Sequence, residues 1–292
     1  EGALMKSERC VNSAHKAISS NLLLVMGLAI AMGFSFPSEA AEFSNTELQL
    51  QYGRLKVPKF AGGGEDNTTI LTVQNASGYR WGDFYGFVDF LKGENSDVNH
   101  FNDYDAYGEM YVNFSSTKLL KINYGKGLLR DIGYVQGFNF DSDANVYKIL
   151  PGIRFSWNIP GFAFLNTDWM AYLDASSGVS PGTFNAPAET DSWMLDVNFA
   201  TKSFQVFGQY FNFEGHIEFI APRENEFGDE VAWHIFGQPQ FRWDVGYALF
   251  GQKDHLFVGT EYQIWIHKLG EKQTNESAFQ GSACGDFDFE VR

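Results

Sequence analysis

Cysteine is nearly absent from this chain of 292 residues: its two cysteines, Cys10 and Cys284, lie near opposite ends. The body of the sequence therefore offers neither a disulfide framework nor a CxxC metal site. An exported protein without internal cysteine avoids mispairing in an oxidising compartment.

Basic residues and long apolar runs are also scarce. Lys and Arg number 21 against 36 Asp and Glu, so the formal net charge is −15, and the mean hydropathy is −0.24. This acidity argues against binding of nucleic-acid phosphates. The hydropathy is too low for a helical membrane protein, whereas a barrel wall meets lipid only at every second residue.

One apolar run, 22–36, stands near the start of the chain. It follows basic residues such as Lys16 and precedes small ones at Ser38 and Ala40. This order is typical of a signal peptide, with cleavage expected near Ala40 or Ala41. A transmembrane anchor is the alternative, but the run is shorter than the ~20 residues that a span needs.

The rest of the chain alternates between polar and apolar residues. In 148–158, Ile149, Ile153 and Phe155 share one face, and Lys148 and Arg154 share the other. Such segments are about 10 residues long, the length of a tilted membrane strand. Aromatic residues make up 17% of the chain, which suits the aromatic girdles of a membrane barrel better than a soluble β-sandwich.

The predicted organisation is all-β, with a leader over 1–41 and a single transmembrane antiparallel β-barrel of about twelve strands over 42–292. The segment 281–292 is an atypical C-terminal tail, which we expect to pair with the first strand. The predicted strands are 47–57, 68–75, 83–91, 104–114, 131–140, 146–158, 161–174, 192–200, 204–214, 237–247, 256–268 and one near the end.

Short and long links alternate along the second half of the chain. The links 159–160 and 201–203 are short, while 175–191 and 215–236 are long, and 92–103 shares the side of the long ones. Bacterial barrels have short periplasmic turns and longer outer loops, so we expect both mature termini in the periplasm. The link 115–130 is long where it should be short, which indicates either a periplasmic loop or a missed element.

Extending the alternation places many charged residues on the inner face, because charge is costly on the lipid face. The expected inner residues are Glu47, Asp83, Asp89, Glu109, Lys148, Arg154, Asp168, Asp174, Asp196, Arg242, Asp244, Glu261 and His267. The aromatics expected to share this face are Tyr85, Phe87, Tyr107, Tyr111, Tyr172 and Trp265, with Phe207 and Phe211 if Gln205 and Gln209 point inward.

A wall of aromatic rings beside carboxylates matches the chemistry of a nucleoside. A base stacks on aromatic rings, at about 1–3 kcal/mol per base in nucleic-acid systems. Ribose hydroxyls need carboxylate or amide partners. Interior packing is the equally weighted alternative, because small barrels fill themselves with side chains. The candidate ligand-binding residues are Tyr85, Asp89, Tyr107, Glu109, Tyr111, Arg154, Asp168, Arg242, Glu261 and Trp265.

Catalytic motifs do not occur in the sequence. The mature part has no GxSxG elbow and no HExxH pair, so we expect no enzyme, no cofactor and no metal site. The acidic segments 224–226 and 229–230 are interpreted as solvated loop.

Several stretches resemble a known family, the nucleoside-specific channel-forming outer-membrane proteins (the Tsx type, with the related OmpK proteins). They are ASGYRWGDFYGFVDF (76–90), YGEMYVNFS (107–115), LPGIRFSWNIPGFAFLN (150–166), QPQFRWDVGYALFGQKDHLFVGTEYQIWIHKLG (238–270) and NESAFQ (275–280). The resemblance implies a monomeric twelve-stranded barrel in the outer membrane with a narrow nucleoside pore. The tail after Gln280 departs from the family's closing strand.

Two functions follow as hypotheses. The first is a passive channel for small polar solutes, with nucleosides as the expected cargo. The second is a surface receptor with an incidental pore, since some relatives of the resembled family bind bacteriophage through their outer loops.

Overall fold

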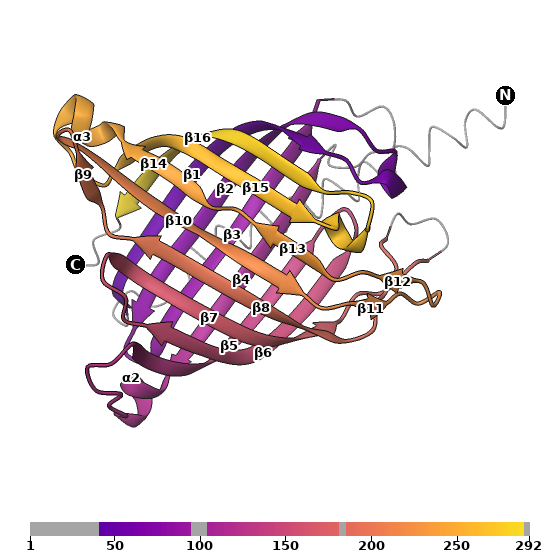
Figure 1. The fold of residues 1–292 in the computed structure, drawn as a ribbon, viewed down its shortest axis with the longest axis horizontal. Helices are drawn as coiled ribbons and strands as arrows, with labels where there is room; N and C mark the ends of the chain where they lie inside the picture. The colour runs from indigo at the N-terminus through magenta and orange to yellow at the C-terminus, as the bar shows by residue number, and fades with distance from the viewer. Residues whose placement is uncertain (1–40, 95–103, 181–184, 289–292) are drawn as a thin grey trace. The chain divides into compact units, whose positions relative to one another are not determined.

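The computed structural model describes residues 41–94, 104–180 and 185–288, so the expected leader lies outside the described residues. The chain divides into two compact units, Glu1–Ser38 and Glu39–Arg292. All described residues belong to the second unit, which is almost entirely β-structure (Figure 1). Its helices, as far as the described residues go, are too short or too polar to cross a membrane.

The strands form one antiparallel sheet that closes on itself, because β10 pairs with β8 on one side and with β13 and β14 on the other. The fourteen strand segments of this sheet make a barrel of twelve, since β9 prolongs β8 and β14 continues β13. The strands are β1 (Ala41–Lys56), β2 (Glu65–Tyr79), β3 (Gly82–Gly93), β4 (Asp105–Ser115), β5 (Leu129–Asp141), β6 (Val146–Trp157), β7 (Phe162–Asp174), β8 (Ser192–Thr201), β9 (Phe204–Val206), β10 (Gln209–Ile220), β13 (His234–Gly237), β14 (Gln240–Asp244), β15 (Leu256–Ile266) and β16 (Glu276–Asp288); the short β11 (Arg223–Glu224) and β12 (Glu230–Val231) pair separately. The helices are η2 (Lys59–Ala61), α2 (Ser116–Leu120), α3 (Val245–Phe250) and η3 (Lys268–Gly270).

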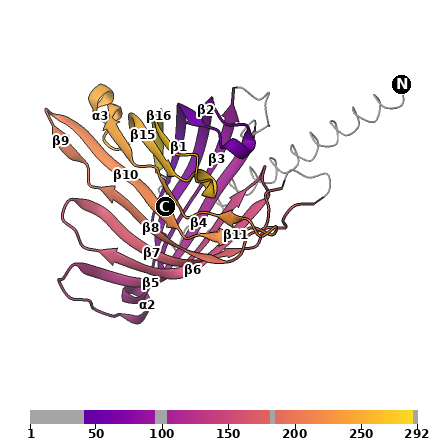
Figure 2. The same cartoon turned by 45° about the vertical axis from the view of Figure 1, so that its right-hand side comes forward.

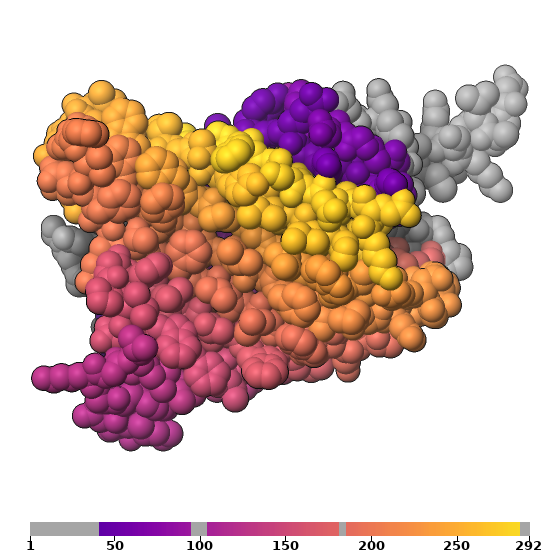
Figure 3. All heavy atoms as spheres, viewed as in Figure 1, coloured from indigo at the N-terminus to yellow at the C-terminus, as the bar shows by residue number. Residues whose placement is uncertain are grey.

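The first and last strands complete the wall. β16 pairs with β1 from Gly53 opposite Gln280 to Asn45 opposite Asp288. In Figure 3 the indigo atoms of the first strands lie against the yellow atoms of the last. The predicted pairing of the tail is therefore confirmed as far as Asp288, while 289–292 lie outside the described residues. Closure matters because an open edge in lipid leaves unpaired backbone groups at several kcal/mol each.

The two faces of the wall differ as the alternation predicts. The outer face exposes apolar side chains on most strands, among them Leu50, Leu71, Phe138, Ile153, Trp169, Ile217, Val258 and Phe279. The inner face carries buried polar residues, including Gln49, Glu109, Asp168, Arg242 and Glu261. A closed barrel with an apolar exterior and a polar interior is the architecture of a bacterial outer-membrane protein.

Aromatic residues gather toward both ends of the barrel. One row joins neighbouring rings 5.3–6.0 Å apart and contains Trp169, Trp193, Phe219 and Trp233. A second row, toward the opposite end, contains Tyr79, Trp81, Phe114 and Tyr134. Such girdles mark the two membrane interfaces.

The two ends of the barrel carry different connections (Figures 1 and 2). The end with α2, α3 and the β9–β10 turn, here called the turn end, also holds the link 158–161. The opposite end, called the loop end, holds the link 175–191 and the β11–β12 hairpin. The irregular link 115–130 contains a missed element: α2, capped by the Ser115 hydroxyl, which accepts from the amide of Lys118.

The predicted strand 204–214 and loop 215–236 are wrong. The chain turns at Phe207–Gly208, where both residues have positive φ, rather than at 201–203. β10 then runs from Gln209 through Ile220, which shortens the loop to 221–233. Residues 215–220 are consequently part of the wall and not of an outer loop.

The predicted strand 237–247 ends early. Asp244 is its last residue, and the Asp244 side chain accepts from the amide of Tyr247 and so caps α3. An aspartate at this position satisfies a helix donor that would otherwise be unpaired, so helix replaces strand over 245–250.

Candidate functional site

All ten candidate ligand-binding residues lie on strands with inward parity, and all are buried or half-buried. Asp89 sits on β3 and accepts from the Thr72 hydroxyl at 2.5 Å. Eight of the other nine fall into three groups: an aromatic wall, an ionic row and a cluster of glutamines around Glu261. Trp265 stands apart from all three. Whether any of them touches a solute remains a prediction.

The aromatic wall spans β3 and β4. The rings of Tyr85 and Phe87 are 6.2 Å apart, and those of Phe87 and Tyr107 are 6.1 Å apart. Tyr111 continues it and packs with Tyr172 in an apolar layer to which Tyr85 also contributes. The further members of that layer are Val135, Leu150, Met170, Met194 and Ile220.

Glu109 is the polar centre of this wall and is 0% exposed. Its Oε2 accepts the Tyr111 hydroxyl at 2.8 Å, and its Oε1 accepts the Tyr107 hydroxyl and the Asn139 amide. Three donors to one carboxylate fix its orientation. Two of the predicted stacking residues are thus also positioned by the predicted carboxylate.

The ionic row crosses four neighbouring strands. In the pairing register Arg154 is opposite Asp168, Asp168 is opposite Asp196, and Asp196 is opposite Glu218. The guanidinium binds Asp168 through Nε at 2.8 Å and Nη2 at 2.6 Å, and reaches Asp83 at 3.0 Å. One cation therefore serves a row of carboxylates, which leaves this level of the lumen acidic.

The apolar layer adjoins the ionic row. Met170 and Met194 face each other two residues closer to the loop end than Asp168 and Asp196, and Ile220 is opposite Met194. An apolar layer and a row of carboxylates therefore lie at adjacent levels of the barrel interior.

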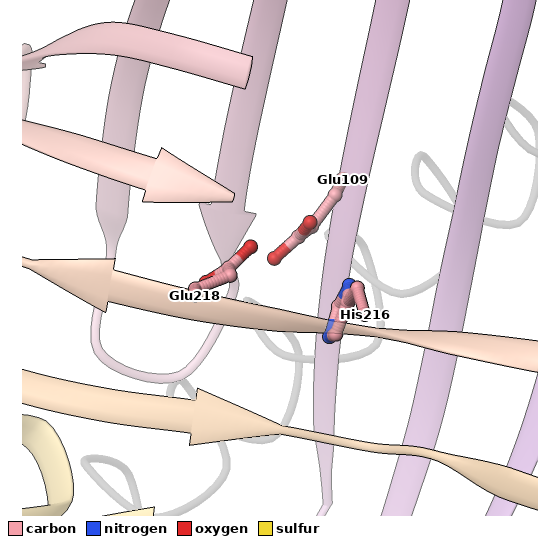
Figure 4. Close-up of side chains that lie close together, drawn as sticks. All are labelled: Glu109, His216 and Glu218. Carbon is pink, nitrogen blue, oxygen red and sulfur yellow. The ribbon is translucent and has the colours of Figure 1, made fainter. Parts of the chain in front are cut away.

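Side chains from β4 and β10 meet across the interior of the barrel. Glu109 is on β4, whereas His216 and Glu218 are on β10, which is not a neighbour of β4 in the closed sheet. Their ligand atoms nevertheless lie within 4.8 Å of one another. Figure 4 shows the two carboxylates pointing toward each other, with the imidazole beside them. The lumen is therefore constricted between these strands.

A second polar centre forms around Glu261, on the other part of the wall. Its carboxylate accepts four side-chain amides at 2.9–3.0 Å, from Gln51, Gln238, Gln240 and Gln280. Arg242 lies nearby and binds Glu47 at 2.8 Å and Glu214 at 2.5 Å. These residues fill the barrel with hydrogen bonds, as the packing alternative requires.

Trp265 does not join the aromatic wall. It is on β15, where its ring stacks on Phe236 at 4.2 Å and lies 5.7 Å from the Lys268 ammonium. The prediction that His267 faces the lumen is wrong. His267 lies beyond the end of β15 and contacts Trp233, because η3 starts there.

The aromatics of the β9–β10 hairpin also face away from the lumen. Phe207 occupies the turn and is fully exposed. The Phe211 ring stacks on the half-exposed Phe241 at 5.4 Å, because the inward residues of β10 have even numbers.

An ion cluster ties the link 175–191 to the barrel at the loop end. Glu189 binds Lys148 at 2.7 Å and Arg223 at 2.6 Å, and Lys148 also binds Asp174 at 3.1 Å. Burial alone would raise the pKa of Glu189, but Arg223 and Lys148 outweigh burial, so this pKa is lowered. Sequence reasoning missed this cluster, since Glu189 carries no signal of its pairing.

Sequence reasoning also missed His216 and Glu218, which it assigned to an outer loop. A signal was present: in 216–220, polar His216 and Glu218 alternate with apolar Ile217 and Phe219. That alternation continues β10 and turns both polar side chains inward.

Comparisons with known proteins find relatives at the level of the fold only. No protein-family model matches the chain, and no curated protein matches it. The solved structures with a similar fold include the KdgM porin, with 8% identity, 82% of this chain and 99% of that chain covered, and a TM-score of 0.40. Another is the translocator domain of the autotransporter NalP from Neisseria meningitidis, with 8% identity, 94% and 98% covered, and a TM-score of 0.40. A third is OccK11 from Pseudomonas aeruginosa, with 9% identity, 87% and 99% covered, and a TM-score of 0.38. These values carry no argument about solute or activity.

Proposed function

We propose that this barrel is a passive outer-membrane channel for small polar solutes and that nucleosides are its preferred cargo. One observation carries the proposal: an aromatic and apolar layer adjoins a row of carboxylates where side chains of β4 and β10 meet across the lumen. A nucleoside has the same division, with a flat base on one side and ribose hydroxyls on the other.

The negative charge at the level of the ionic row favours nucleosides over nucleotides. Asp196, Glu218 and Glu109 outnumber the cations there, since Arg154 is held by Asp168 and Asp83. Like charges in a narrow, partly desolvated pore repel far more strongly than in bulk water. A nucleotide should therefore pass less readily than a nucleoside.

The site should hold its solute weakly, because a site that binds tightly cannot conduct. The sequence resemblance to nucleoside-specific channels agrees with this choice and further implies a monomer.

Liposome swelling with adenosine, ribose and AMP tests the proposal. The unmutated protein should pass adenosine faster than ribose, and ribose faster than AMP. Tyr111→Ala should reduce the preference for adenosine about fivefold or more, as expected for loss of one stacking ring at ~1 kcal/mol or above. Glu109→Gln should reduce it by removing a ribose acceptor.

Tyr147→Ala is the matched control, because this tyrosine is exposed on the outer parity of β6. Equal flux of ribose and adenosine in the unmutated protein would reduce the function to a general pore. A preference that survives both lumen substitutions would show that these side chains only pack.

The contacts between the connections at the loop end favour a second function, that of a surface receptor. The links 175–191 and 221–233 are joined by a bridge between Glu189 and Asn225, and by Glu226, which accepts from the amides of Val179 and Ala188. A shaped platform of this kind suits recognition by a large partner such as a bacteriophage. Deleting 225–229 should abolish adsorption in a receptor and leave flux intact in a channel.

A further inference from the structure

Glu109, His216 and Glu218 combine two carboxylates and one imidazole in the interior of the barrel. Their ligand atoms lie within 4.8 Å of one another. Two ligands of a tetrahedral zinc ion stand roughly 3.3 Å apart, given metal–ligand bonds of about 2.0–2.1 Å. Rotation of the His216 and Glu218 side chains toward the fixed Glu109 carboxylate would therefore bring the three atoms onto one ion without movement of the strands.

Two ligand atoms of this group are unused by the protein. Oε1 of Glu218 and Nε2 of His216 are buried and have no hydrogen-bond partner among the described residues. Glu218 is only 2% exposed, and Figure 4 shows its carboxylate directed at Glu109. A buried polar atom without a partner costs about 1–3 kcal/mol, and more when charged. An ion at this point would satisfy both atoms at once.

The surrounding charge demands a cation. Asp196, 4% exposed, stands opposite Glu218 in the register, so three buried carboxylates share the space with one imidazole. The guanidinium of Arg154, in the same row across the strands, is already bound to Asp168 and Asp83. Buried charges of like sign are unfavourable unless they are neutralised by a proton or a metal ion.

Glu109 is held in place as metal ligands usually are. Tyr107, Tyr111 and Asn139 all donate to it, and Oε2 keeps a second lone pair beside the Tyr111 bond. Outer partners of this kind orient a ligand and raise its affinity for the ion. Imidazole with carboxylate suits a divalent first-row transition metal better than calcium or magnesium, which prefer oxygen alone.

We propose that Glu109, His216 and Glu218 bind a divalent transition-metal cation that bridges β4 and β10 across the lumen. Three protein ligands leave a coordination position for water. Because the ligands come from opposite walls, the ion cross-links the barrel. It also obstructs the constriction, a consequence that rests on the proposed channel.

Titration of the full, refolded protein with Zn²⁺ by calorimetry, and with Co²⁺ by visible absorption, tests the site. We expect one ion per chain and a rise in the temperature at which the barrel unfolds. His216→Gln and Glu218→Gln should each weaken binding by more than about tenfold, the scale seen for metal-site partners. Both substitutions keep the side-chain volume near native and remove or neutralise one ligand.

Two exposed residues supply the matched controls, His255→Gln and Glu224→Gln, which should bind as the unmutated protein does. Heat-modified migration on gels establishes that each variant is folded. Absence of binding in the unmutated protein, or binding unchanged in both site variants, would overturn the proposal.

Adenosine flux, with and without Zn²⁺, separates this proposal from the channel. Zn²⁺ should reduce flux in the unmutated protein and not in Glu218→Gln. Site-dependent binding with unaltered flux would overturn the obstruction and leave the metal site standing. Binding in a barrel that passes no adenosine at all would overturn the channel instead.

Discussion

Arg154 is the cation whose removal should disturb the interior most. Its guanidinium makes two bonds to Asp168, at 2.8 and 2.6 Å, and one to Asp83 at 3.0 Å. Asp168 is 0% exposed, whereas the side chain of Asp83 is 43% exposed and can be hydrated. Arg154→Met keeps most of the volume and leaves the buried Asp168 carboxylate without its cation, with only the Asn198 amide donating to it.

The expected loss comes almost entirely from Asp168. Breaking a buried pair by removing one partner costs about 3–5 kcal/mol, because an uncompensated charge is left behind. This is roughly a 150- to 5,000-fold change in the unfolding equilibrium at about 1.36 kcal/mol per factor of ten. The contribution of the half-exposed Asp83 pair is at most ~1 kcal/mol.

Urea unfolding in lipid vesicles, followed by tryptophan fluorescence, measures this loss. Arg54→Met is the control, because its pair with Glu65 is 70% and 43% exposed on the two sides and should be worth about 0–1 kcal/mol. Asp168→Asn added to Arg154→Met should recover at least half of the loss, since no buried charge remains. A loss no larger than that of the control, or no recovery in the double variant, would refute the reasoning.

Three more predictions concern topology, a backbone constraint and pH. A membrane-impermeant maleimide on intact cells should label Phe227→Cys in the loop-end hairpin and spare Phe207→Cys in the turn; the reverse pattern would invert the barrel. Gly215→Ala should lower the unfolding temperature more than Gly228→Ala: both glycines have positive φ, of 142° and 83°, but only at Gly215 would a Cβ stand 2.4 Å from a carbonyl oxygen, whereas the site of Gly228 is open; equal effects would contradict this. Because the pKa of Glu189 is lowered from 4.5, its stabilisation is present above that value and is lost as the pH falls through the lowered pKa; amide protection of 185–191 should therefore be constant above pH 4.5 and fall only at lower pH, and a fall near neutrality would contradict the assignment.

The architecture could be predicted because strands that alternate polar and apolar residues can span a lipid bilayer only as a closed barrel. A strand with one apolar face must pair on both edges, and many such strands must close. The alternation of Lys148 and Arg154 with Ile149 and Ile153 was sufficient to place these four side chains on their faces. Turn positions were harder to predict, because the inward polar residues of a strand cannot be told by type from the polar residues of a loop. The stretch 215–220 was therefore assigned to a loop although it belongs to β10.

The sequence by itself determined the class of protein, the inward parity of the ten candidate residues and the pairing of the tail with the first strand. Each of these depends on local periodicity, which is set by the backbone of a single strand. Only the tertiary structure decided which inward residues meet. Glu109 lies 107 positions from His216, and their approach depends on the register and curvature of the whole closed sheet, because β4 and β10 face each other only when the barrel is complete. Closure of the sheet also places Trp265 away from the aromatic wall, although its inward parity alone had suggested that it would lie with those rings.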